Sequence, residues 1–131
     1  MFTPKKSTTQ EIGDLGEEKA SQYLKDRGYR ILERNYKVKI EKTVIGELDI
    51  ISKKSGHLIF VEVKSRFGQD NRYSPFDNIT APKKKQLIRL ANFYIKAKKI
   101  SLDSPWQIDV IAVEFNDNEK PKIEHLEKAV F

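Results

Sequence analysis

The stretch "GELDIISKKSGHLIFVEVKSR", residues 46–66, decides the fold. It contains two apolar segments separated by "KKSG", a run typical of a turn, so it predicts two strands joined as a hairpin. Three charged residues interrupt these segments: Asp49 lies in the first, and Glu62 and Lys64 lie in the second. Burying an unpaired charge is costly, because the charge loses its hydration. The three charges therefore either compensate one another or bind a ligand.

The pattern of apolar residues assigns the rest of the chain to helices, strands and loops. The predicted elements are a helix over 13–28, strands over 29–40, 47–52, 57–65 and 106–115, a turn over 41–46, a loop over 67–82, a helix from near Pro82, and a short final element over 122–131. The residues expected on the buried faces of the two helices are Ile12, Leu15, Ala20, Tyr23 and Leu24 in the first and Leu87, Leu90, Ala91 and Tyr94 in the second. This order predicts an α/β fold with a mixed central sheet flanked by helices.

Length and composition limit the class of protein. The chain has 131 residues, which suits one domain over 12–131 behind a flexible tail over 1–11. A net charge of +6 favours an anionic partner such as nucleic acid. The absence of cysteine excludes disulfides and cysteine-based zinc sites. With no run of about 18 apolar residues and no secretory signal, the chain is expected to be cytoplasmic and not bound to a membrane.

The interrupting charges can be brought together by strand geometry. Side chains alternate along a strand, so Glu62 and Lys64 share a face, and hairpin pairing would bring Asp49 within reach of Glu62. Two converging carboxylates repel each other, and a divalent cation removes that repulsion. Hard oxygen ligands suit Mg²⁺ or Mn²⁺, and the backbone carbonyl of Val63 could complete the set. Lys64 could then orient or deprotonate a water, so the residues together describe phosphodiester hydrolysis.

Other charged residues extend this interpretation more weakly. Glu17 borders the apolar stripe of the first helix and could point towards the strands, although a helix edge often carries a solvated acid. Glu47 shares a strand face with Asp49 but is better explained as an exposed charge. The basic residues that could hold a phosphate backbone are Arg66, Lys83, Lys84, Lys85 and Arg89. The alternative for these residues is a solvated face. Asp109 is interpreted as part of a structural pair.

The order of these residues resembles a known nuclease family. An Asp followed by a strand-borne Glu-x-Lys is the signature of the PD-(D/E)xK superfamily. The segments "GDLGEEKASQYLKDRGYRILERNY", "GELDII", "LIFVEVKSR", "APKKKQLIRLANFYI" and "QIDVIAV" resemble the YraN-like endonuclease family, which is similar to archaeal Holliday-junction resolvases. The resemblance covers residues 12–131. It implies a restriction-endonuclease-like fold, metal-dependent cleavage of DNA, branched DNA as substrate, and a homodimer.

The resemblance also carries over to single residues. Asp49 and Glu62 match the metal-binding acids, Lys64 matches the catalytic lysine, and Glu17 matches the helix-borne glutamate of resolvase-type sites. Two segments depart from the family pattern. "KVKIEKTVIG", residues 37–46, is longer than the usual connection and predicts an extended first hairpin. "WQID" stands where the family more often has Arg-Phe-Asp, which removes any role for an arginine there.

Two further interpretations compete with a nuclease. A non-catalytic module that kept the fold would bind nucleic acid in a salt-dependent way without cutting it. A structural protein would use Asp49, Glu62 and Lys64 only as a buried ion-pair network, and Glu62→Ala would then destabilise it strongly. In a nuclease, removal of a repelling carboxylate from the metal-free site costs little stability.

Overall fold

The computed structural model describes residues 8–68, 76, 79–117 and 120–130. Within these residues the elements follow one another as α1 (Thr9–Asp26), β1 (Arg30–Ile40), β2 (Thr43–Lys54), β3 (His57–Phe67), α2 (Ala81–Ala97), β4 (Trp106–Phe115) and β5 (Lys122–Leu126). The described strands form one sheet in the order β1-β2-β3-β4-β5. β3 and β4 are parallel, and the other neighbours are antiparallel. The predicted α/β class and mixed sheet are confirmed.

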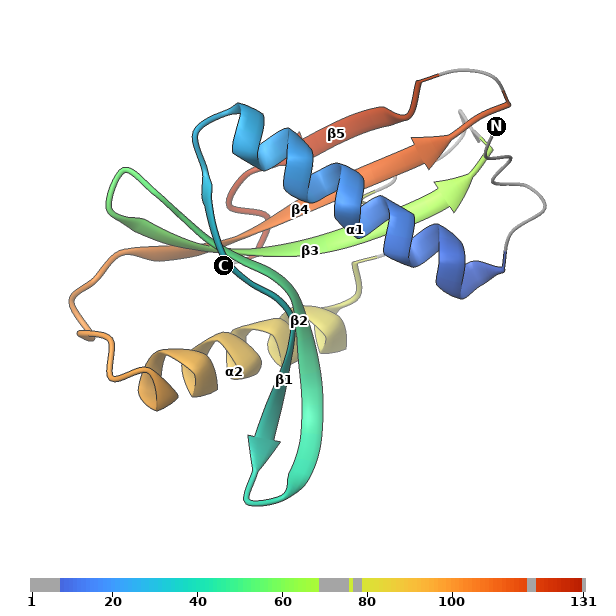
Figure 1. Ribbon diagram of the computed structural model, residues 1–131. Coiled ribbons are helices and arrows are strands. Elements are labelled where there is room, and N and C mark those ends of the chain that lie inside the picture. Colours follow the sequence, from blue (N-terminus) through green and yellow to red (C-terminus); the bar gives the residue numbers. More distant parts are fainter. Residues whose placement is uncertain (1–7, 69–75, 77–78, 118–119, 131) are drawn as a thin grey trace.

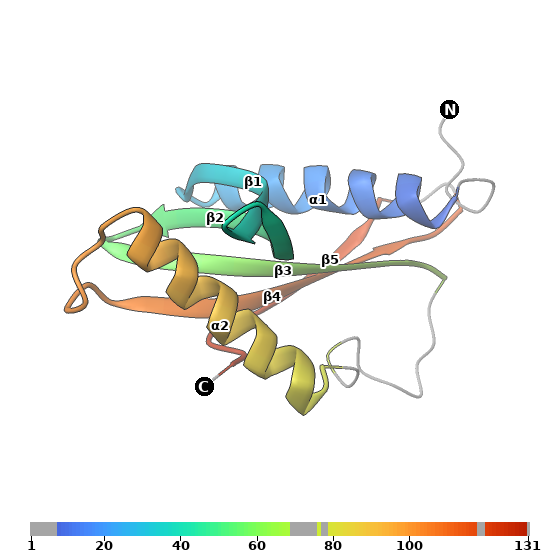
Figure 2. The same cartoon turned by 90° about the horizontal axis from the view of Figure 1, so that it is seen from below.

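The two helices cover opposite faces of this sheet, so β3 and β4 are sandwiched between layers (Figures 1 and 2). α1 packs on one apolar cluster that includes Ile50, Val61 and Ile111. α2 packs on a second cluster that includes Ile51 and Phe60. Residues adjacent in a strand thus face different helices, as the alternation of side chains requires. This arrangement agrees with the restriction-endonuclease-like fold that the resemblance implied.

α1 begins earlier than the apolar pattern predicts. Thr8 caps the helix: its side chain accepts a hydrogen bond from the backbone N–H of Glu11, whose carboxylate accepts one from the Thr8 N–H. This reciprocal cap satisfies two N–H groups that a helix start leaves free. The prediction that residues 9–11 belong to a flexible tail is therefore wrong, and residues 1–7 lie outside the described part. Gly28, with φ +87°, follows the helix where a stop was predicted.

The β1–β2 hairpin is extended, as the long connection predicted. β2 begins at Thr43 and pairs with Ile40, so the predicted turn over 41–46 is in fact much shorter. β2 pairs with β3 only from Ile50 onward. Beyond that point the hairpin continues as a two-stranded ribbon that leaves the sheet (Figure 1). Asp49 therefore lies where β2 parts from β3.

A polar network crosses the core on the side of β5. Asp109 is fully buried, and its carboxylate accepts hydrogen bonds from the Gln107 side chain at 2.8 Å and the Lys128 backbone N–H at 3.0 Å. His125 Nε2 lies 2.8 Å from the same carboxylate, and His125 Nδ1 lies 3.2 Å from the Tyr23 hydroxyl. Because buried carboxylates are stable only when paired, this network explains Asp109 as structural. The interpretation of Asp109 as part of a structural pair is confirmed.

Most of the predicted 67–82 loop lies outside the described residues. β3 extends to Phe67, and α2 begins at Ala81 with Thr80 as its N-cap, close to the predicted start at Pro82. The buried residues of α2 include Leu87, Leu90, Ala91 and Tyr94, as predicted. Neither α1 nor α2, the helices of the described part, is long and apolar enough to cross a membrane.

Candidate metal centre

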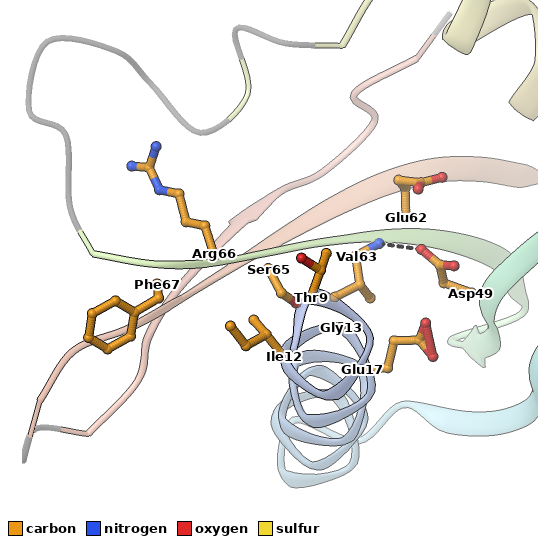
Figure 3. Close-up of a pocket in the computed structure, with 10 residues that line it drawn as sticks. All are labelled: Thr9, Ile12, Gly13, Glu17, Asp49, Glu62, Val63, Ser65, Arg66 and Phe67. Atoms are coloured by element: carbon orange, nitrogen blue, oxygen red, sulfur yellow. Dashed lines mark hydrogen bonds between the residues drawn. The ribbon is translucent and has the colours of Figure 1, made fainter. Parts of the chain in front are cut away.

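The separation of β2 from β3 opens a cavity lined by carboxylates. Two adjoining cavities, of about 370 and 680 Å³, are both lined by Glu17, Asp49 and Glu62. These residues come from α1, β2 and β3, respectively. Figure 3 shows Asp49 lying between Glu62 and Glu17. The structure thus brings together the three acids singled out in the sequence, and their role in binding metal stays a prediction.

Asp49 is held in place by the backbone of β3. Its Oδ2 accepts a hydrogen bond of 2.8 Å from the Val63 N–H (dashed line in Figure 3). This bond lies where the β2–β3 ladder has ended, so the carboxylate takes the place of a missing backbone partner. One carboxylate oxygen is thereby fixed and the side chain cannot rotate freely. The carbonyl of Val63, predicted as a further ligand, belongs to the same residue that orients Asp49.

The three acids are electrostatically crowded. Burial, followed by the nearby Asp49 charge, raises the pKa of Glu62 to about 7. Burial and then the Asp49 charge also raise the pKa of Glu17 to about 7. Burial likewise raises the pKa of Asp49, although the Val63 N–H opposes this. Without a cation, the cluster therefore holds protons at pH values where isolated carboxylates are ionised.

The donor set fits a divalent cation that keeps part of its water shell. Glu17 Oε2 is buried and has no hydrogen-bond partner among the described residues. Within the described ranges, no group of three or more acidic or histidine side chains is close enough together to hold one metal ion. Mg²⁺ typically takes one or two protein carboxylates and completes its octahedron with waters and phosphate oxygens. An open pair such as Asp49 and Glu62, with Glu17 beside it, suits that chemistry.

The lysine paired with these acids comes from α2 and not from β3. Lys83 Nζ lies 3.6 Å from Glu62 Oε2, and Lys83 lines the larger cavity. Lys64 follows Glu62 by two residues on β3, is partly exposed, and lines neither cavity. The sequence suggested Lys83 only as a phosphate contact. Its contact with Glu62 depends on how α2 packs under the sheet, which no local spacing reveals.

The other predicted basic residues divide into two groups. Arg66 lines the smaller cavity and donates a 2.7 Å hydrogen bond to Glu114, a buried acid that sequence reasoning did not single out. Arg66 and Glu114 are register partners in the parallel β3–β4 pair. Four members of the predicted basic set, Lys83, Lys84, Lys85 and Arg89, lie on α2 and are exposed. Arg66 and Lys83 are therefore the two members of the set that reach the cavities.

Glu17 reaches the site because α1 packs unusually close to β3. A Cβ atom at Gly16 would lie 1.7 Å from Ser65 Oγ and 2.7 Å from Ser65 Cβ. We expect Gly16→Ala to push α1 away from β3 and to lower the free energy of unfolding by about 1–3 kcal/mol, despite the better helix propensity of alanine. Urea unfolding measures this change.

Gly13→Ala is the matched control on the same helix. A Cβ at Gly13 meets no atom within 4 Å. This substitution should therefore stabilise the protein by about 0.5–1 kcal/mol, through helix propensity alone. Equal effects of the two substitutions would show that the close approach of α1 does not constrain the site.

Comparison with known proteins agrees with the resemblance seen in the sequence. A model of "Uncharacterised protein family UPF0102" matches residues 16–113. The chain belongs to this family. UPF0102 is the YraN family, so that resemblance is confirmed. Relatives named "UPF0102 protein" include one from Clostridium kluyveri, 37% identical over 94% of this chain and 96% of its own length. Another, from Roseiflexus castenholzii, is 35% identical over 91% of this chain and 92% of its own length.

One solved structure aligns with most of this chain. Pyrococcus furiosus SfsA in complex with Ca²⁺ aligns with a TM-score of 0.44 and 18% sequence identity. The alignment covers 94% of this chain and 65% of the SfsA chain.

Proposed function

We propose that this UPF0102 protein is a metal-dependent endonuclease that hydrolyses DNA phosphodiester bonds. The observation that carries the proposal is the meeting of Asp49, Glu62 and Glu17, from three separate elements, in one open cavity. The raised pKa values of Glu17 and Glu62 mean that ionising these carboxylates destabilises the metal-free protein. Groups with strongly shifted pKa values are concentrated at functional sites. The cofactor is Mg²⁺ or Mn²⁺.

Each residue at the site has a distinct task in this proposal. Asp49 and Glu62 hold the cation, with the Val63 carbonyl as a further ligand, and Glu17 assists directly or through a water. The bound cation supplies Lewis acidity and lowers the pKa of a coordinated water. Lys64 positions the attacking water and offsets negative charge that develops on the phosphate. Arg66, which Glu114 holds in place, contacts the phosphate backbone.

The family resemblance and the charge of the surface support one class of substrate. The exposed lysines at the start of α2 suit contacts with phosphates, which position a protein on DNA without reading its sequence. We therefore propose recognition of DNA structure, with branched or junction DNA preferred. Symmetric cleavage of a junction requires two active sites, which a cytoplasmic homodimer would provide.

The test is cleavage of a labelled four-way junction beside a matched linear duplex. Wild type and Glu62→Ala are compared in Mn²⁺, Mg²⁺ and EDTA. We expect wild type to cut only with metal, the junction faster than the duplex, and Glu62→Ala not to cut. Salt-sensitive binding of both DNAs without cleavage at any metal concentration would instead identify a non-catalytic binding module.

A further inference from the structure

The first turn of α2 carries charges that helix stability does not explain. Lys83, Lys84 and Lys85 follow one another there, and the first turn contains no acid. A helix N-terminus has a partial positive charge, so cations at this position are unfavourable and acids are preferred. The Thr80 side chain already caps the helix by accepting a hydrogen bond from the Lys83 N–H. The lysine side chains therefore serve something other than the helix.

Lys83 differs from its neighbours because its side chain enters the carboxylate cluster. Its Nζ lies 3.6 Å from Glu62 Oε2, and its side chain is 46% exposed while that of Glu62 is 15% exposed. Lys83 lines the larger cavity together with Glu17 and Asp49. Arg66, the other basic residue at the cavities, is engaged by Glu114 instead. Lys83 is thus the cation that balances Glu62 in the metal-free protein.

Metal binding weakens this ion pair. A divalent cation on Glu62 would lie within a few ångströms of the Lys83 ammonium, and at that distance like charges repel strongly in a partly buried site. A half-exposed lysine can leave easily, because its four-carbon stem is flexible and its head group hydrates well. The place most favourable for the displaced ammonium is an anion beside the metal. A DNA phosphate that enters the site supplies that anion.

We propose that Lys83 exchanges between Glu62 and a substrate phosphate, and thereby couples metal binding to DNA binding. This inference rests on the proposed function, since it takes the same carboxylates as the metal site. Lys83 forms an ion pair with Glu62 when metal and DNA are absent, and it contacts a DNA phosphate when both are present. By thermodynamic reciprocity, DNA then tightens metal binding by the same factor as metal tightens DNA binding. Lys83 is a positioning residue, distinct in its task from Lys64.

The first test measures Mn²⁺ affinity without DNA, by electron paramagnetic resonance of the free ion. The titration is done above about pH 8, where the carboxylates are ionised despite their raised pKa values, so that protons do not compete with the metal. Lys83→Gln removes the competing cation, so we expect it to bind Mn²⁺ about 3- to 10-fold more tightly than wild type. Lys83→Arg keeps the charge, and Lys96→Gln removes an exposed charge from the last turn of the same helix. Both should bind Mn²⁺ with nearly the affinity of wild type.

The second test repeats the Mn²⁺ titration with a fully phosphorothioate duplex, which keeps the backbone charge and resists hydrolysis. The duplex should tighten Mn²⁺ binding to wild type and to Lys96→Gln at least about threefold more than to Lys83→Gln. If Lys83→Gln binds Mn²⁺ no more tightly than wild type, or responds equally to DNA, the exchange is overturned while the nuclease stands. If neither wild type nor any of the variants binds Mn²⁺, both the exchange and the metal site are overturned.

Discussion

Glu62→Gln should raise the free energy of unfolding of the metal-free protein by about 1–3 kcal/mol at pH 8 and leave it unchanged at pH 5. Burial and the Asp49 charge raise the pKa of Glu62 to about 7 in the folded protein. At pH 8 the folded protein must hold this carboxylate ionised next to Asp49, which is unfavourable. Glutamine keeps the shape of a protonated glutamate and removes the charge. Stabilisation by loss of a buried acid is the reverse of what a structural ion pair predicts.

The pH dependence of wild type has a definite sign. Between the ordinary glutamate pKa of 4.5 and the folded value of about 7, the folded state binds more protons at Glu62 than the unfolded state does. The contribution of Glu62 to stability is therefore present at low pH and is lost as pH rises through this window. Loss of the half-exposed Lys83 ion pair in Glu62→Gln subtracts less than about 1 kcal/mol. The pH slope should thus be shallower in the variant than in wild type.

Urea unfolding in EDTA at pH 5 and pH 8 measures both quantities. Glu18→Gln is the matched control, because Glu18 follows Glu17 on α1 but is exposed. It should change stability by less than about 0.5 kcal/mol at either pH. A large loss of stability in Glu62→Gln at pH 8 would contradict an open metal site and favour the buried ion-pair network.

Strand alternation and a recognisable turn were enough to predict that Asp49 and Glu62 lie side by side. The pairing of Ile50 with Val61 places these two acids at the next position along the hairpin. What the sequence could not predict is that the ladder ends there. The parting of β2 from β3 creates the cavity, and it follows from how the long β1–β2 ribbon bends over α2.

Contacts between distant elements were the least predictable. Lys83 meets Glu62 only because α2 packs beneath β3, and Glu17 reaches Asp49 only because Gly16 admits Ser65 so closely. Neither packing distance has a local sequence signal. The early start of α1 is different, because Thr8 and Glu11 have the spacing of a capping box and could have been recognised. Apolar periodicity alone does not extend to the first turn of α1, because the residues of the cap are polar.

Asp49→Asn and Glu17→Gln should separate the residue that binds the cation from the residue that assists it. Both substitutions remove one negative charge from the same cavity. Asparagine can still accept the hydrogen bond from the Val63 N–H, so the fold should persist. We expect Asp49→Asn to lower single-turnover cleavage by at least about 10³-fold and to weaken Mn²⁺ binding more than about tenfold.

Glu17→Gln should lower cleavage and Mn²⁺ affinity less than Asp49→Asn does. Glu17 lies on α1, and in the proposed site it assists the cation from beside Asp49, directly or through a water. Groups that orient a metal site from behind its ligands are typically worth about 10- to 100-fold in activity. Cleavage rates and Mn²⁺ affinities of the two variants, measured side by side with wild type, give the comparison. Retention of cleavage within tenfold in Asp49→Asn would remove Asp49 from the metal site. Equal losses of cleavage and of Mn²⁺ affinity in the two variants would instead show that Glu17 is a direct ligand. Glu17 on α1 and Asp49 on β2 would then contribute equally to metal binding.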